Sequence, residues 1–314
     1  MLFASLPLAA LEAPADRAKP ADRAKEEGNE SRLQRLEDRF IKTNIKVSEK
    51  IDDWAEDVDI FLVGKRVTRK RNESFIRLEN STYFERDQSI RNETNINASI
   101  RLPNVEEYWQ LKLTTYDEPR EARAANAGPR RRGPRERNVG AAVGIFRRLG
   151  NIRTTYQPRV ELRDPLRVSH TLAFESWAEV TKIRVNPKLE FFADANRGVG
   201  IFKVLNFTYR FTNMWSLSLI NQADYEEKYH RYSVTNGISV GQELTDEEAL
   251  SYNLFFLSNN RPNYHLQNYN VSITWSQVLY RRILDYQVTP YLEFDESRGY
   301  GGVPGLTFDL NLNF

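Results

Sequence analysis

The sequence contains no cysteine, only three histidines and no long hydrophobic run, and each absence excludes a class of protein. Without cysteine the chain forms no disulfide, has no thiol chemistry and carries no lipid anchor on a cysteine. No stretch of 18 apolar residues occurs, which excludes a transmembrane helix. The 45 basic and 43 acidic residues give a net charge of +2, which supplies no argument for nucleic-acid binding. No metal-binding or nucleotide-binding motif is present, so we predict neither a metal site nor a cofactor.

The last nine residues alternate strictly between apolar and polar side chains. A period of two indicates a strand with one apolar and one polar face. This stretch resembles the C-terminal strand of Gram-negative outer-membrane β-barrels, in which a terminal Phe and alternating apolar residues form the signal read by the barrel-assembly machinery. The resemblance implies an integral outer-membrane protein, with outer-membrane lipid and the assembly machinery as partners. The residues that would form the signal are Leu306, Phe308, Leu310, Leu312 and Phe314.

The same alternation continues back to about residue 73. No helical period survives after residue 58, so no protein layer is available to cover the apolar face, whereas lipid can cover it. Breaks in the pattern between residues 86 and 302 separate fourteen predicted strands. We therefore predict an all-β membrane protein, a closed antiparallel transmembrane β-barrel over 73–314. Twelve strands, with one hairpin folded elsewhere, is the alternative. An even strand number places both ends of the barrel on the periplasmic side.

The segment before the barrel is divided into three parts. Residues 1–13 resemble the end of a signal peptide, and 14–30 are predicted to be a disordered linker. Residues 31–57 are predicted to form an amphipathic periplasmic helix capped by Ser31, followed by a basic connector that ends at 72. The apolar stripe of this helix must contact something: its own barrel, the lumen, a second copy or an envelope protein. Its residues are Leu33, Leu36, Phe40, Val47, Ile51 and Trp54.

Charged side chains recur on the polar face of the predicted strands. By strand parity they project into the lumen, where they either interlock as a structural network or line an aqueous path that prefers anions. These lumen-lining residues are Arg153, Arg159, Glu161, Arg163, Lys182, Arg184, Lys188, Glu190 and Glu293.

The only long loop, residues 117–138, is predicted to lie outside the cell. Arginine binds phosphate in a bidentate manner, so we expect contact with lipopolysaccharide phosphates. The alternatives are a loop folded into the lumen that screens anions, and a solvated loop. The candidate contact residues are Arg130, Arg131, Arg132 and Arg135.

No catalytic residue is predicted. The segment from His230 to Gly237 distantly resembles the His-x-Ser-Asn-Gly stretch of outer-membrane phospholipases, but Ser233 stands one residue too far from His230. On a strand this shift moves the serine to the opposite face from the histidine. A lipid acyl hydrolase is therefore only a third hypothesis.

The layout as a whole resembles a group of uncharacterised proteobacterial outer-membrane proteins, with a signal, a periplasmic helix ending in a segment such as Trp54-Ala55-Glu56-Asp57-Val58, and a barrel. This resemblance implies no activity. The first hypothesis is a structural or pore-forming barrel that passes small solutes or serves as an envelope scaffold. The second is a barrel subunit of a larger envelope, secretion or appendage complex, docked through the helix.

Overall fold

The structure is a computed structural model, and it describes residues 20–64, 74–86, 88–103, 109–125, 134–135, 137–195 and 197–314. The chain divides into two compact units after Thr43. Helix α1 (Pro20–Val63) belongs to both units, and all strands belong to the second. No helix among the described residues is both long and apolar enough to cross a membrane.

Fifteen strands, the short helix α2 and two 3-10 helices, η1 and η2, follow α1 along the chain. Their bounds are β1 Phe75–Glu85, β2 Arg91–Arg101, β3 Trp109–Thr114, α2 Glu118–Ala125, β4 Gly140–Leu149, β5 Ile152–Glu161, β6 Arg167–Ser176, β7 Ala178–Val180, β8 Ile183–Asp194, β9 Gly198–Arg210, β10 Trp215–Glu226, β11 Arg231–Glu243, β12 Glu248–Asn259, β13 His265–Leu279, η1 Tyr280–Arg282, β14 Leu284–Asp295, η2 Glu296–Arg298 and β15 Gly302–Asn313.

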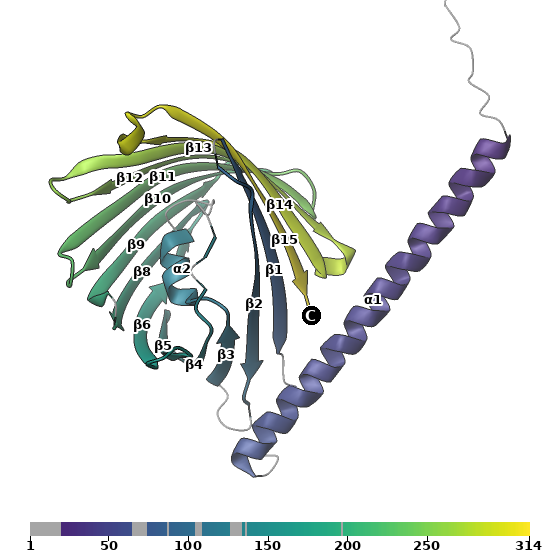
Figure 1. The fold of residues 1–314 in the computed structure, drawn as a ribbon, viewed down its shortest axis with the longest axis horizontal. Helices are drawn as coiled ribbons and strands as arrows, with labels where there is room; N and C mark the ends of the chain where they lie inside the picture. The colour runs from purple at the N-terminus through teal and green to yellow at the C-terminus, as the bar shows by residue number, and fades with distance from the viewer. Residues whose placement is uncertain are drawn as a thin grey trace, which may run out of the picture. The chain divides into compact units, whose positions relative to one another are not determined.

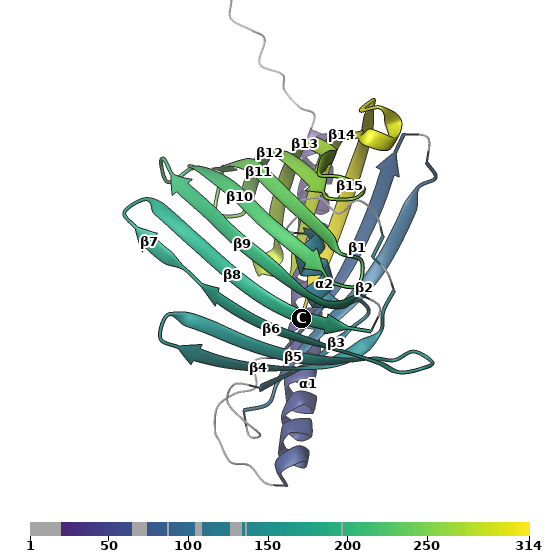
Figure 2. The same ribbon diagram turned by 90° about the vertical axis from the view of Figure 1, so that its left-hand side faces the viewer.

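The sheet is closed. Consecutive strands pair antiparallel, β15 returns to pair with β1, and β6 pairs directly with β8. The three-residue β7 pairs only with β8 and stands outside the ring, so fourteen of the fifteen strands form the wall. Figures 1 and 2 show these tilted strands from two sides. The predicted closed barrel of fourteen strands is therefore confirmed, and twelve strands is excluded.

Strand β13 shows which face of the sheet is exposed. Val271 and Ile273 are 46% and 43% exposed, whereas Ser272 and Thr274 between them are 2% and 4% exposed. A soluble sheet would bury the apolar side chains and expose the polar ones. Here the apolar face is the outer surface and the polar face is packed inside the barrel, as in transmembrane barrels. The same outward apolar positions recur around the wall, including Ile96, Leu113, Val168, Phe191, Leu205, Leu219, Ile238 and Leu292.

Three glycines, on three separate pairs of adjacent strands, are each covered by an aromatic ring from the paired strand. Phe192 faces Gly200, Phe255 faces Gly237, and Tyr291 faces Gly305 in direct cross-strand register. A Cβ added at these glycines would lie 2.2, 2.4 and 2.1 Å from the respective ring atoms. Only glycine leaves room for a ring that lies flat against the next strand.

Helix α1 is longer than predicted at both ends. It begins at Pro20 instead of Ser31, so residues 20–30 are helical and not the linker that we expected. It ends at Val63 instead of near residue 57. The predicted signal segment 1–13 and most of the basic connector lie outside the described residues.

Within the second unit, the C-terminal part of α1 contacts the barrel. The Asn44 side-chain amide donates to the carbonyl oxygen of Asn313 on β15 at 2.7 Å. Ala55 is fully buried and packs with Ile100 and Leu102. Part of this helix therefore contacts the protein's own barrel, but through residues outside the predicted apolar stripe, of which Leu36 and Trp54 are 61% and 51% exposed. What covers the stripe stays a prediction.

The prediction that no helix follows residue 58 is wrong. Helix α2 interrupts the long connection between β3 and β4, and Figure 1 shows it inside the curve of the strands. The described part of the 117–138 loop thus enters the barrel, which was the first alternative to a loop outside the cell.

Candidate functional site: a loop across the barrel lumen

Helix α2 begins at a side-chain cap. The Asp117 carboxylate accepts a hydrogen bond from the backbone N–H of Arg120 at 3.2 Å, which satisfies one of the free donors of the first turn. Lys112 on β3 binds the Glu118 carboxylate at 2.7 Å. These two contacts fix the start of the helix next to the end of β3.

The first anchor of the loop is a buried ion pair with β8. Arg123 of α2 binds Glu190, and their side chains are only 5% and 2% exposed. The Lys188 ammonium group contacts the other Glu190 oxygen at 2.8 Å. The Arg123 guanidinium also lies over the Phe192 ring, 4.3 Å from its centroid. A charge pair this deeply buried is strongly destabilised when one partner is removed.

The second anchor is formed by Arg135, which binds Glu79 on β1. Its backbone N–H donates to the Glu93 carboxylate of β2 at 2.6 Å, and its guanidinium lies 3.7 Å from the centroid of the Tyr116 ring. Arg135 was a candidate for lipopolysaccharide contact, but its side chain is 9% exposed and faces inward. Arg130, Arg131 and Arg132 lie outside the described residues.

The third anchor is Arg159 on β5, a predicted lumen residue that is 3% exposed. Its guanidinium donates to the Thr114 hydroxyl at 2.6 Å and to the Asn138 carbonyl oxygen at 2.5 Å. The two ends of the loop are thereby fixed to the wall.

Together these anchors carry the loop across the lumen. Arg135 is held by β1 and β2, whereas Arg123 is held by β8. In the ring, β3, β4, β5 and β6 lie between β2 and β8 on one side, and β9 to β15 separate β8 from β1 on the other. The described loop residues therefore connect opposite parts of the wall and narrow the interior between them.

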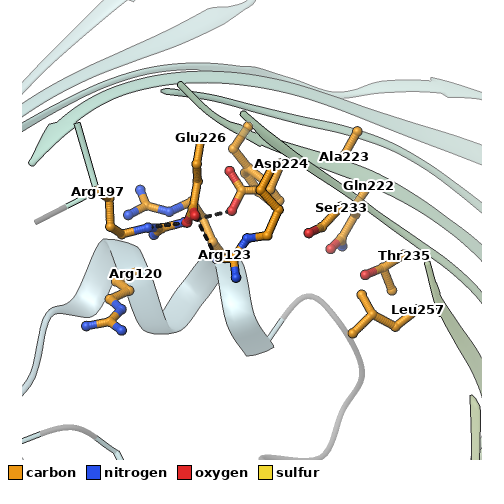
Figure 3. Close-up of a pocket in the computed structure, with 12 residues that line it drawn as sticks. Arg120, Arg123, Arg197, Gln222, Ala223, Asp224, Glu226, Ser233, Thr235 and Leu257 are labelled. Carbon is orange, nitrogen blue, oxygen red and sulfur yellow. Dashed lines mark hydrogen bonds and ion pairs between the residues drawn. The ribbon is translucent and has the colours of Figure 1, made fainter. Parts of the chain in front are cut away.

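A cavity of about 250 Å³ lies between α2 and strands β9 to β12. Figure 3 shows Arg123 from α2 pointing toward Asp224 and Glu226 on the strands. Arg197 binds Glu226 and also Asp224, the latter at 2.9 Å, and Arg231 binds the second Glu226 oxygen at 2.6 Å. We call this space, lined among others by these residues, the β10 cavity.

The predicted lumen residues do not form one cluster. Lys188, Glu190 and Arg159 contact the loop as described above. Arg163 is 52% exposed at its pair with Glu161, and Arg184 pairs with Glu179 at 3.2 Å with both side chains more than half exposed. The remaining members lie apart: Lys182 contacts the Phe211 carbonyl oxygen, Arg153 lies over the Phe146 ring, and Glu293 accepts weakly from Asn268.

Sequence reasoning missed the residues of the β10 cavity. Asp224 and Glu226 were assigned to a break between strands, but β10 continues to Glu226 and places both carboxylates inward. If the alternation of this strand had been continued to residue 226, it would have placed both carboxylates on the inner face. Arg123 lies in the short helix α2 and Arg197 in the turn between β8 and β9, and neither segment is long enough for a periodic signal to indicate the direction of a side chain.

The histidines do not meet in one place. His170 faces outward, and its Nδ1 lies 3.0 Å from the Tyr156 hydroxyl. His265 contacts Glu296 at 2.9 Å, and His230 stands in the β10–β11 turn. In the described part of the chain, no group of three or more His, Asp or Glu side chains is arranged to hold a metal ion.

The predicted assembly signal forms β15. Its apolar residues face outward, and the terminal Phe314 exchanges two backbone hydrogen bonds with Ile76 at 2.9 and 3.2 Å. The terminal residue therefore closes the last rung of the seam between β15 and β1.

Comparison with known proteins gives structural but no sequence matches. No protein-family model and no curated protein matches the sequence. The chain is similar to the outer-membrane channel DcaP of Acinetobacter baumannii, with a TM-score of 0.49, 6% identity, and coverage of 78% of this chain and 97% of that one. It is similar to a loop-deletion mutant of OmpT, an outer-membrane protein of Vibrio cholerae, with a TM-score of 0.48, 6% identity, and coverage of 77% and 99%. It is also similar to OccK11 of Pseudomonas aeruginosa, with a TM-score of 0.44, 9% identity, and coverage of 77% and 96%. The closed barrel itself is established by the strand pairing of this chain.

Proposed function

We propose that the protein is a solute channel of the bacterial outer membrane, narrowed by its own inward loop and selective for small anions. The observation that carries this proposal is the loop held to opposite walls by Arg123 and Arg135. A barrel that served only as a scaffold would need no such structure in its interior. A channel needs a charged narrow zone to select among solutes.

The sign of the selectivity follows from the charges beside the β10 cavity. Among the residues that line it, Arg123, Arg197 and Arg231 face the two carboxylates of Asp224 and Glu226. The next pair on β8, Lys188 and Glu190, adds one charge of each sign. These groups therefore carry an excess of one positive charge, which attracts anions into a low-dielectric passage.

Planar-bilayer recording of the purified full-length protein tests this proposal. In a KCl gradient we expect discrete channels whose reversal potential indicates chloride preference. Arg231→Gln should reduce that preference, because its guanidinium is 49% exposed toward the lumen and is not the sole partner of Glu226. Arg184→Gln, at an exposed pair on β8, is the matched control and should leave selectivity unchanged. A barrel without conductance, or with cation preference, contradicts the proposal.

The outer-membrane location is proposed from the apolar outer surface and from the lengths of the connections. The long β3–β4 connection lies at the opposite end of the barrel from the C-terminal residue, and the turns at the C-terminal end are short, such as Gly150–Asn151. Outer-membrane barrels have short periplasmic turns and longer extracellular loops. We infer that α1 and Phe314 lie on the periplasmic side. Labelling of a cysteine introduced at Tyr229 in intact cells, compared with one at Asp246, tests this orientation.

A second candidate function, docking of an envelope protein, is favoured by α1. Trp54 and Phe61 are 51% and 83% exposed, and they are seven positions apart, which places them on one helix face. Pull-down with the full chain and with Trp54→Glu/Phe61→Glu should show a helix-dependent partner. A partner retained equally by both proteins, or none at all, removes the support for this function.

A further inference from the structure

The β10 cavity has the features of a binding site as well as those of a passage. Its floor is a polar grid on two adjacent strands, in which Gln222 faces Thr235 and Asp224 faces Ser233 in direct register. Its roof is α2, which contributes Arg120 and Arg123. Figure 3 shows the labelled floor residues on one side of the cavity and α2 on the other. The two surfaces come from distant parts of the chain, so the site exists only because the loop enters the barrel.

Two acceptor atoms in this grid have no hydrogen-bond partner among the described residues. They are Oε1 of Gln222 and Oδ1 of Asp224. Gln222 is only 6% exposed, and a buried acceptor without a donor is costly. The second oxygen of Asp224 is already bound by Arg197. Gln222 and Asp224 are two positions apart on β10 and therefore present their free oxygens on the same face.

The opposite requirement comes from Arg231, whose side chain is 49% exposed and contacts Glu226 through its Nη2 at 2.6 Å, which leaves its other N–H groups available to a ligand. Each guanidinium carries five N–H groups and matches a carboxylate in a bidentate manner. A ligand that satisfies the whole site must therefore have an anionic group for Arg231 and neutral donors for Gln222 and Asp224. Hydroxyl groups meet the second need better than an ammonium group, because the excess positive charge of the cavity repels a cation.

We propose that the β10 cavity binds a small polyhydroxylated carboxylate, that is, a monomeric sugar acid. The volume of about 250 Å³ is below the usual range of drug-sized pockets, which favours one ring over an oligomer. The carboxylate lies against Arg231, and the hydroxyls donate to Gln222 and Asp224. Phe202, buried beside Asp224 on the adjacent strand, forms an apolar edge to the site. This inference rests on the proposed channel, because the solute reaches the site through the lumen.

Two measurements on the full-length protein test the proposal separately from conductance. Equilibrium dialysis in detergent with labelled galacturonate measures binding, and bilayer recording measures block of the chloride current. Galactose, which has the hydroxyls without the charge, and acetate, which has the charge without the hydroxyls, are the comparison solutes. We expect galacturonate to bind at least tenfold more tightly than either.

Variants assign the binding to the cavity. Gln222→Leu should weaken galacturonate about fivefold to tenfold, since it removes one buried acceptor of similar shape. Gln157→Leu is the matched control, because Gln157 is equally buried on the inner face of β5 but does not line the cavity. Arg231→Gln should weaken galacturonate and leave galactose unchanged, and it serves if Gln222→Leu does not assemble.

The outcomes separate the site from the channel. Saturable binding lost in Gln222→Leu but retained in Gln157→Leu supports the site, whether or not the barrel conducts. Conductance without any preference for galacturonate over acetate and galactose overturns the site and leaves the channel in place. Binding that is equal in Gln222→Leu and Gln157→Leu also overturns it.

Discussion

The ion pair between Arg123 and Glu190 should control whether the loop stays docked, and Glu190→Gln tests this directly. The substitution keeps the size of the side chain and removes its charge. Arg123 then remains 5% exposed without the carboxylate that it binds, beside the Lys188 ammonium group that also contacted Glu190. Breaking one side of a buried ion pair costs roughly 3–5 kcal/mol. The docked loop should therefore be weakened by at least about 3 kcal/mol.

This loss of docking free energy can be converted into the fraction of molecules in which the loop is undocked. Since about 1.4 kcal/mol corresponds to a factor of ten, about 3 kcal/mol raises the undocked fraction roughly 100-fold. Trypsin cleaves only the undocked chain after Arg123, and when opening is fast the cleavage rate follows this fraction. Mass spectrometry of the assembled barrel should show cleavage after Arg123 rising by about two orders of magnitude in Glu190→Gln.

The matched control is Glu179→Gln. Glu179 on β7 pairs with Arg184 on β8, but both side chains are more than half exposed. Such exposed pairs contribute at most about 1 kcal/mol to stability. Its cleavage after Arg123 should equal that of the parent protein. The double variant Arg123→Gln/Glu190→Gln should dock better than Glu190→Gln alone, because the unpaired buried charge is gone, as judged by trypsin cleavage at Arg120. Equal cleavage in the parent and Glu190→Gln would show that this pair does not hold the loop.

Three further predictions concern the barrel wall. Gly305→Ala should reduce the heat-modifiable, folded band on electrophoresis, because the new Cβ would lie 2.1 Å from the Tyr291 ring. Adding Tyr291→Ala to the same chain should restore the folded band, and no loss of that band in Gly305→Ala alone would contradict the close packing. Ile273→Lys should destabilise the barrel against urea by about 2–4 kcal/mol, which is the cost of a lysine at the lipid-facing midplane. The control Ile273→Val should cost less than about 1.5 kcal/mol, and equal stability of the two variants would argue against a lipid-facing Ile273. Deletion of Phe314 should lower the amount of assembled protein in the outer membrane, since it removes the last residue of the predicted assembly signal and both hydrogen bonds to Ile76, whereas Phe314→Tyr should assemble normally. Unchanged assembly after the deletion would remove the proposed role of this residue.

The wall could be predicted because its information is local. Alternation over about ten residues determines both the strand and its faces, and the lipid-facing set of β13 and β15 was placed correctly. Asn236-Gly237, which is a common hairpin turn, was kept within one strand because its flanks are too short, and it lies in the middle of β11.

The errors at α1 and α2 have different causes. The segment from Pro20 to Glu30 was assigned to a linker because of its proline and charge, but its alanine, lysine and glutamate favour a helix, and proline is tolerated in a first turn. Helix α2 has only eight residues, which is too short for a reliable helical period. Neither error changes the barrel, because both segments lie outside its wall.

The position of the loop could not be predicted, because its partners are distant in the sequence and lie on opposite parts of the ring. Arg135 and Glu79 are 56 residues apart, and Arg123 and Glu190 are 67 apart. Parity places Glu79 and Glu190 inside the barrel but does not reveal which cation neutralises them. An arginine-rich segment outside the strands has the same sequence whether it binds external phosphates or enters the lumen.

In the channel that we propose, a structural network and an anion-preferring path are not alternatives. Glu190 and Glu79 neutralise Arg123 and Arg135 and fix the loop, so these charges contribute little to selectivity. Beside the cavity, Glu226 is shared by Arg197 and Arg231, so one carboxylate serves two guanidiniums. The loop is held by balanced pairs, and the positive excess remains where the wall has too few acids. Selectivity should therefore respond to substitutions around β10 and β11, and loop docking to substitutions at β1 and β8.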